Sequence, residues 1–152
     1  MYVGLKGLKM VQVDFIKMIN IHVALKNYLT DLLSNEEVKS LDYVKIKQDN
    51  VCYLGKLIES NTHELVILPA YEEVRRLHAN FHGLTAEILR LHQADQPAKA
   101  TQLLHGRFEM VFRKLKSRII SLSQQYNASH SSLIKCNRTL KSTKTSLTPQ
   151  SV

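Results

Sequence analysis

Residues 69–93, PAYEEVRRLHANFHGLTAEILRLHQ, carry the pattern that decides the fold. Pro69 suits the first turn of a helix, because the N–H that proline lacks has no partner there. We therefore predict a long helix that begins near Pro69 and ends at about Gln93. Its apolar side chains recur every three or four residues, as on one helix face, at Val74, Leu77, Phe81, Leu84, Ile88 and Leu91.

Similar apolar stripes predict two more long helices in the rest of the chain. One runs from Val11 to Leu33, and the other is restarted by Pro97 and ends at about Tyr126. Strand signals are nearly absent. The predicted fold is therefore all-α: an antiparallel helical bundle of three long helices plus one or two short ones.

The segments between the long helices have weaker patterns. SNEEV (34–38) has the signature of a capping box, which favours a short helix. DNVCYLGKLIES (49–60) is expected to form another, capped by Asp49 or Asn50. NTHELVIL (61–68) is expected to be a loop or irregular link.

The positive charge is concentrated near the C-terminal end. The formal net charge of the 152 residues is +8, and residues 127–152 hold four basic and no acidic side chains, with six serines and four threonines. This composition is too poor in apolar groups to pack. We therefore predict a helical domain at 1–126 and a disordered basic tail at 127–152. The tail is either a solubilising extension or a tether to nucleic acid or a membrane surface.

Other features bear on compartment and partners. No run approaches the roughly 18 apolar residues of a membrane span, and the first residues lack signal-peptide features. Two cysteines 84 positions apart indicate no disulfide framework. We expect a cytoplasmic protein with reduced thiols. Nucleic acid is not the expected partner, because no helix-turn-helix or aromatic-basic pattern accompanies the charge.

Three histidines lie on or beside the predicted apolar stripes. His78 and His82, in LHANFH (77–82), are one helical turn apart on the same face, and His22 lies inside the stripe of the first long helix. Each has a simpler interpretation as well. Histidines four residues apart also occur on solvated faces, and a lone core histidine is often only hydrogen-bonded.

The stretch VCYLGKLIES (51–60) adds a sulfur to these histidines. Cys52 either fills space in a core or uses its thiol chemically, and Gly55 either permits close packing or marks a turn or C-cap. One soft sulfur and three imidazole nitrogens, brought together from different helices, are a sensible tetrahedral set for Zn²⁺.

The segments NIHVAL (20–25), CYLGKLI (52–58) and LHANFH (77–82) together resemble the chemoreceptor zinc-binding domain, a bacterial helical module. The resemblance covers roughly residues 10–126. It implies that the four zinc ligands are His22, Cys52, His78 and His82.

Two features of the family's pattern are missing. Leu57 stands where the family has a tryptophan, and Ala24 and Leu25 replace an aromatic residue that usually follows the first histidine. Family members are usually fused to a receptor or a diguanylate cyclase, and neither segment is recognisable in this sequence.

The resemblance implies a stand-alone zinc-binding sensor in bacterial signalling, connected with chemotaxis or cyclic-di-GMP. Four protein ligands leave no open position on zinc, so an enzyme is not expected. Oxidation of Cys52 would weaken its bond to zinc and release the short helix that carries it. A change in zinc level would act on the same site. The signal is expected to reach a chemoreceptor or diguanylate cyclase in trans, or a second copy of the chain.

Two alternative functions fit parts of the pattern. A metal-independent helical adaptor needs only the bundle. A hemerythrin-like metal-binding bundle needs carboxylate ligands; His105 and Glu109, four residues apart, are candidates, although an exposed surface pair is the simpler interpretation. Cys136, in the predicted tail, is either an idle thiol or a resolving thiol for oxidised Cys52. The histidines expected to be solvated are His63, His92 and His130.

Overall fold

The computed structural model describes residues 13–34, 41–60 and 63–142, with side chains up to residue 132. The long helices of the bundle are α1 (Phe15–Ser34), α5 (Tyr71–Gln93) and α7 (Glu109–Ser142).

Shorter elements join the long ones. Between α1 and α5 lie α2 (Tyr43–Lys47), the 3₁₀ turn η1 (Asp49–Val51), α3 (Tyr53–Glu59) and α4 (His63–Val66). Between α5 and α7 lie α6 (Pro97–Leu103) and the π-helical turn η2 (Leu104–Phe108).

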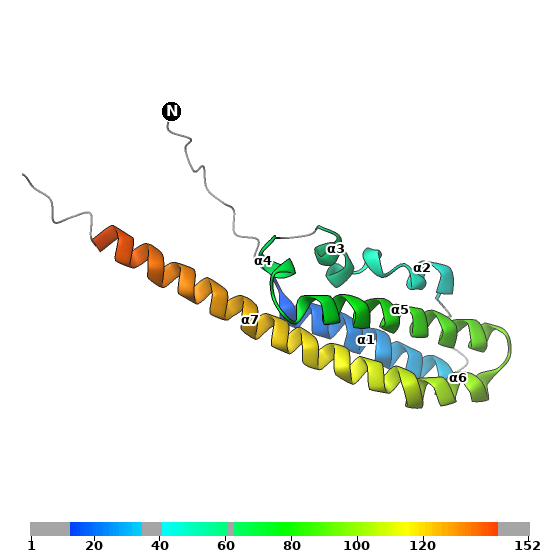
Figure 1. The fold of residues 1–152 in the computed structure, drawn as a ribbon. Coiled ribbons are helices and arrows are strands. Elements are labelled where there is room, and N and C mark those ends of the chain that lie inside the picture. The colour runs from blue at the N-terminus through cyan, green and yellow to red at the C-terminus, as the bar shows by residue number, and fades with distance from the viewer. Residues whose placement is uncertain (1–12, 35–40, 61–62, 143–152) are drawn as a thin grey trace, which may run out of the picture.

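The chain passes along the bundle four times in alternating directions (Figure 1). Helices α1 and α5 run one way; the series α2, η1, α3 and α4, and the pair α6 and α7, run the other way. The second pass is therefore a broken helix that lies along α5. Within the described parts of the chain no strand occurs, and the predicted all-α antiparallel bundle is confirmed.

The predicted stripes form the core. All six stripe residues of α5 are buried, from Val74 to Leu91, and so are their counterparts on η2 and α7. The Phe81 ring is fully buried, with its centroid 5.0 Å from that of Phe108 and 6.2 Å from that of Phe112. These three rings pack together about halfway along α5, where His78 and His82 also lie.

The long helices differ from prediction at their ends. Helix α5 begins at Tyr71, because Pro69 lies in the turn before it, and α7 continues past Tyr126 to Ser142. The first of the extra turns of α7 has a partner in α4: His130 Nε2 lies 3.3 Å from Glu64 Oε2. Residues 127–142, placed in the tail by composition, are therefore helical, and residues 143–152 lie outside the described part.

The short segments differ more. Residues 49–60 are not one helix, because η1 ends at Val51 and Cys52 is the N-cap of α3, so the prediction of Asp49 or Asn50 as its cap is wrong. The loop prediction for 61–68 is wrong at α4, a helical turn held by the buried Leu65. The predicted helix at 34–38 falls almost wholly outside the described residues.

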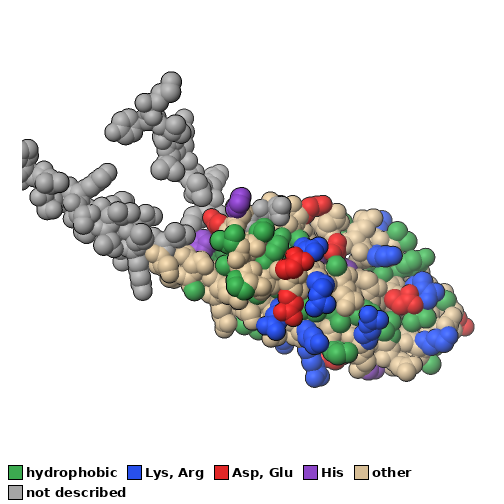
Figure 2. All heavy atoms as spheres, viewed as in Figure 1, with side chains coloured by type: hydrophobic (Ala, Val, Ile, Leu, Met, Phe, Trp, Pro, Cys, Tyr) green, Lys and Arg blue, Asp and Glu red, His purple; other side chains and the backbone are tan. Residues whose placement is uncertain are grey.

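The surface carries side chains of both charges. Figure 2 shows Lys and Arg interspersed with Asp and Glu on one face of the bundle. Arg118 pairs with Glu73 at 2.7 Å, and Arg90 with Glu87 at 2.7 Å. Exposed pairs of this kind contribute little to stability. Among the helices of residues 13–34, 41–60 and 63–142, none has the length and apolar character needed to cross a bilayer.

Candidate metal centre

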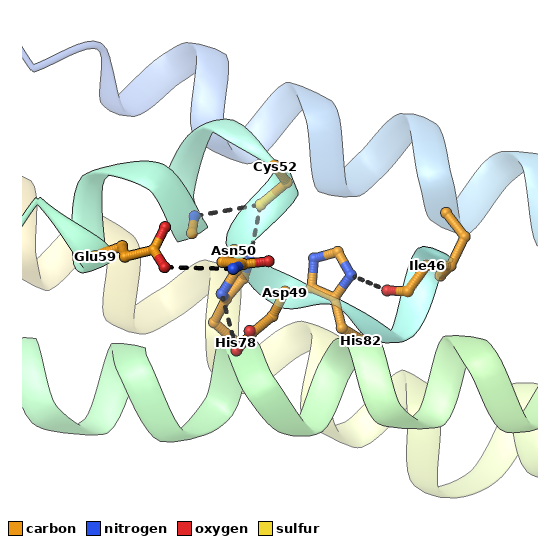
Figure 3. A network of polar contacts seen from close by, with 8 residues as sticks. Ile46, Asp49, Asn50, Cys52, Glu59, His78 and His82 are labelled. Atoms are coloured by element: carbon orange, nitrogen blue, oxygen red, sulfur yellow. Dashed lines mark hydrogen bonds and ion pairs between the residues drawn. The ribbon is translucent and has the colours of Figure 1, made fainter. Parts of the chain in front are cut away.

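One histidine of α1, two of α5 and the cysteine between η1 and α3 meet inside the bundle. The atoms that His22, Cys52, His78 and His82 offer to a metal all lie within 4.8 Å of one another. Figure 3 shows Cys52 and His78 pointing toward each other, with His82 one turn further along α5. The structure thus brings together the four residues that the sequence motifs single out.

The centre lies against the core. His22, His78 and His82 expose 2%, 0% and 3% of their surface, whereas Cys52 is half-buried. The ring centroids of His22 and Phe81 are 5.1 Å apart. The histidines therefore occupy a region from which water is largely excluded, where each polar atom needs a partner.

Two of the histidines are oriented by backbone carbonyl groups. His22 Nδ1 lies 2.6 Å from the Met18 carbonyl oxygen, and His82 Nδ1 lies 2.8 Å from that of Ile46. A carbonyl oxygen only accepts, so in both rings Nδ1 carries the proton and Nε2 has a free lone pair. Both Nε2 atoms are buried and have no hydrogen-bond partner. A metal ion is the kind of partner that such a lone pair fits.

His78 is held differently. Its Nε2 lies 2.9 Å from Cys52 Sγ, while its Nδ1 is buried and has no hydrogen bond. Asp49 Oδ2 lies 4.0 Å from that Nδ1. Cys52 Sγ also accepts a hydrogen bond from the Gly55 N–H, at 3.3 Å.

Burial sets the protonation of the four side chains. It lowers the pKa of His22 to about 4, against a smaller opposing effect of the hydrogen bond to Met18. Burial, together with the neighbouring His82 and His22, lowers the pKa of His78 to about 2, and burial also lowers that of His82. All three imidazoles are therefore neutral at pH 7, the form that binds metal.

The thiol is affected in the opposite sense. Burial raises the pKa of Cys52, and the N–H groups of Gly55 and Leu54 only partly offset this. Without a metal Cys52 is therefore a protonated thiol at neutral pH. It is the one member of the centre that must lose a proton to become a ligand.

Gly55 lies where α3 meets η1. A Cβ atom built on Gly55 would lie 1.8 Å from the Asp49 carbonyl oxygen, a separation that no real contact allows. The glycine therefore lets η1 press against the first turn of α3. Its place in that first turn does not match a helix C-cap.

Two hollows flank the centre. An apolar cavity of about 420 Å³ between α1 and α2 is lined by Ile21, His22, Leu25, Tyr28, Leu41, Ile46, Val51, Cys52 and His82. A polar groove of about 690 Å³ is lined by residues that include Asp49, Glu59, Arg75 and His78. Cys52 thus borders the first hollow, and His78 borders the second.

The other candidates lie apart from this centre. Glu109 is bound to Lys26 at 2.6 Å and to Arg113 at 2.8 Å, and His105 is exposed. In the part of the chain that the structure covers, no other group of three or more His, Cys, Asp or Glu side chains is close enough to hold an ion. The carboxylate ligands of a hemerythrin-like site are not found at this centre.

The remaining histidines and the second cysteine have varied surroundings. His63 is exposed and His92 partly so. The prediction of a solvated His130 is wrong, because its side chain is 14% exposed and its Nε2 lies 3.3 Å from Glu64 Oε2. The side chain of Cys136 lies outside the described part.

Sequence reasoning missed the groups that orient the histidines. The carbonyl groups of Met18 and Ile46 carry no sequence signal, since every residue has one. The sequence pattern indicates Asp49 only as a possible helix cap, and its position three residues before Cys52 is the one feature that connects it with the centre.

In comparisons with protein-family profiles, with curated proteins and with solved structures, nothing matches this chain. The case for its function therefore depends on the centre itself.

Proposed function

We propose that the centre binds one Zn²⁺ ion through His22, Cys52, His78 and His82, and that the chain is a regulatory sensor domain. The observation that carries this proposal is the pair of buried Nε2 atoms on His22 and His82, which have no partner and face the same point as Cys52 and His78. Burial of such atoms without a partner costs free energy, so their arrangement favours an ion between them.

The donor set favours zinc among common metals. Calcium and magnesium take oxygen ligands, whereas one thiolate and three imidazoles in a compact group suit the tetrahedral coordination of zinc. Four protein ligands leave no position for substrate or reactive water. A structural or regulatory role is therefore proposed in place of catalysis.

We propose Cys52 as the switch, because it is the oxidisable ligand and is more exposed than the histidines. A two-electron oxidant such as hydrogen peroxide would transfer one oxygen atom to the thiolate, giving a sulfenate at Cys52 and releasing water. The sulfur would then hold zinc less tightly and also lose its hydrogen bond from Gly55. The first turn of α3 would loosen as a result.

The output is proposed from the resemblance of NIHVAL, CYLGKLI and LHANFH to the chemoreceptor zinc-binding domain. Family members are usually fused to a receptor or a diguanylate cyclase, so we propose that a partner of this type, acting in trans in the bacterial cytoplasm, receives the signal. Self-association of the bundle is the other proposed route.

Metal analysis of the purified protein tests the site. We expect one zinc per chain in the wild type, and loss or strong weakening of binding in Cys52→Ala. Cys136→Ser is the matched control, because it removes the other thiol of the sequence and should keep full zinc content. A wild-type protein that neither carries zinc nor takes it up after addition would overturn the proposal.

Peroxide treatment tests the switch. We expect stoichiometric zinc release, measured with a chromogenic chelator, from the wild type and from Cys136→Ser at similar rates. Hydrogen exchange should then quicken in α3 before it quickens in α5. Retention of zinc while mass spectrometry shows oxidised Cys52 would rule out this mechanism.

A further inference from the structure

We propose that Asp49 is the outer hydrogen-bond partner of His78 and fixes Nε2 as the nitrogen that His78 presents to the metal. This inference rests on the proposed zinc site and assigns a positioning residue within it. It begins from a difference between the three histidines.

Metal-binding histidines almost always donate their second ring N–H to a carbonyl or carboxylate group, which holds the ring and its tautomer. His22 and His82 meet this rule through the carbonyl oxygens of Met18 and Ile46. His78 is the most buried of the three, and its Nδ1 has no hydrogen-bond partner. His78 is thus the one histidine of the centre whose second ring nitrogen has no acceptor.

The Asp49 carboxylate is placed to be this acceptor. Its Oδ2 lies 4.0 Å from His78 Nδ1, and its side chain is 41% exposed on the rim of the polar groove. A hydrogen bond of about 2.9 Å requires this partly exposed carboxylate to move about 1 Å closer. Figure 3 shows Asp49 beside His78, on the side away from Cys52.

Competing partners of Asp49 are engaged elsewhere. Arg75, which lines the same groove, is bound to Glu72 through two hydrogen bonds and acts on Asp49 only through its charge. The Asn50 amide donates its hydrogen bond to Glu59. Among the described residues, Asp49 forms no ion pair other than the long one with His78. Its carboxylate is therefore available to the imidazole.

A carboxylate at this position also balances charge. Zinc carries two positive charges, the Cys52 thiolate supplies one negative charge and Asp49 supplies the other. Buried charge is stable only when it is compensated. A carbonyl partner, as on His22 and His82, would orient the ring without this compensation.

The backbone fixes the position of Asp49 through Gly55. The Asp49 carbonyl oxygen occupies the space that a Cβ of residue 55 would need. Asp49, Cys52 and Gly55 are spaced three residues apart, so a single close contact places both the carboxylate and the sulfur relative to His78.

The test compares Asp49→Ala and Asp49→Asn with Glu59→Gln, a control that changes another carboxylate of the same groove. Zinc affinity is measured by competition with a chromogenic chelator. We expect a 10- to 100-fold loss in Asp49→Ala, the range typical of outer partners of metal ligands. Asp49→Asn should lose less because its amide oxygen still accepts, and Glu59→Gln should match the wild type.

The second readout does not need zinc. Two-bond ¹H–¹⁵N correlation spectra of the metal-free protein report the tautomer of His78. We expect the Nδ1–H form in the wild type and a mixture of tautomers in Asp49→Ala, with His22 and His82 unchanged. Correct folding of the variant is checked by the remaining amide spectrum.

The outcomes separate the two proposals. A wild type that binds no zinc defeats the proposed function, while the tautomer of His78 still tests Asp49. A wild type that binds zinc no more tightly than Asp49→Ala, with the same His78 tautomer in both, overturns the role of Asp49 and leaves the zinc site standing.

Discussion

The two sides of the candidate centre are supported in different ways. His78 and His82 lie on α5, a 23-residue helix with twelve buried residues, whereas neither α2 nor η1, which precede Cys52, buries a side chain. The histidine side is therefore part of the core, and the segment from Tyr43 to Glu59, here called the cysteine arm, packs against it through the buried Leu54 of α3. The arm also orients His82 through the Ile46 carbonyl oxygen, so a movement confined to α3 would displace Cys52 while the supports of His22 and His82 stay in place.

Removing the core beneath the histidines should give the largest effect. Phe81 is fully buried beside His22 and His82. We expect Phe81→Ala to lower the free energy of unfolding of the metal-free protein by about 3–5 kcal/mol, measured by urea denaturation. Ile67→Ala is the control, since Ile67 is 73% exposed and its loss should cost about 0.5 kcal/mol or less. Equal effects of the two variants would show that the histidine side is not part of the core.

The next largest effect should come from lowering the pH, which should reduce the free energy of unfolding through the buried histidines. The pKa of His22 is lowered to about 4 and that of His78 to about 2, so below the ordinary histidine pKa of about 6.5 the unfolded chain binds more protons than the folded one. Stability is therefore full above pH 6.5 and falls as the pH drops toward these values. At pH 5.5 the loss should be about 1.4 kcal/mol for each of the two histidines.

Urea denaturation of the metal-free protein at pH 7.5 and 5.5 measures this loss. The control is His63→Gln, which changes an exposed histidine and should leave the pH dependence as it is. A flat profile between these pH values would mean that the histidines are hydrated in the metal-free protein.

A change in the cysteine arm should have a smaller effect on folding and a larger one on metal binding. Gly55→Ala places a Cβ against the Asp49 carbonyl oxygen and must displace η1 from α3. We expect a loss of about 1–3 kcal/mol in unfolding free energy and a zinc affinity at least about tenfold weaker. Gly83→Ala is the matched control, because a Cβ there meets nothing within 4 Å, and it should be neutral or stabilise α5 by up to about 1 kcal/mol. If both variants bind zinc like the wild type, the close contact has no part in forming the site.

The smallest expected effect is the release of protons when zinc binds, which should come from the cysteine side of the centre and not from the histidine side. The histidines are already neutral at pH 7, and burial keeps Cys52 protonated. Zinc binding should therefore release about one proton per ion, and none in Cys52→Ala. Calorimetric titration in two buffers with different heats of ionisation counts the protons. Release of two or more by the wild type would show that histidines also change their charge.

The long helices were predictable because burial repeats along them. The stripe from Val74 to Leu91 appears in the sequence as it appears in the core, and His78 and His82 follow from the same periodicity. The cysteine arm offers no such repeat, since its helices have seven residues or fewer. For that reason the sequence pattern predicts Cys52 inside a helix, whereas it is the N-cap of α3. The four-residue turn of α4 is likewise too short to show a periodic pattern.

The side chains of the candidate site were predictable from the sequence, whereas the backbone groups that orient them were not. Residue types and spacing single out His22, Cys52, His78 and His82, which the structure brings together. The carbonyl groups that orient His22 and His82 depend on how α2 lies against α5 and on the helical turn before His22, and sequence spacing does not encode them.

The C-terminal part of α7 extends beyond the rest of the bundle. Figure 1 shows this helix projecting past the ends of its neighbours, and its base is tied to the end of the second pass by Gln125 with Ala70 and by His130 with Glu64. The residues from 127 to Ser142 extend about 24 Å at 1.5 Å per residue. A tilt of about 10° at the base would move the far end by about 4 Å. A tilt too small to disturb the core would thus become a displacement of several ångströms at the far end of the helix.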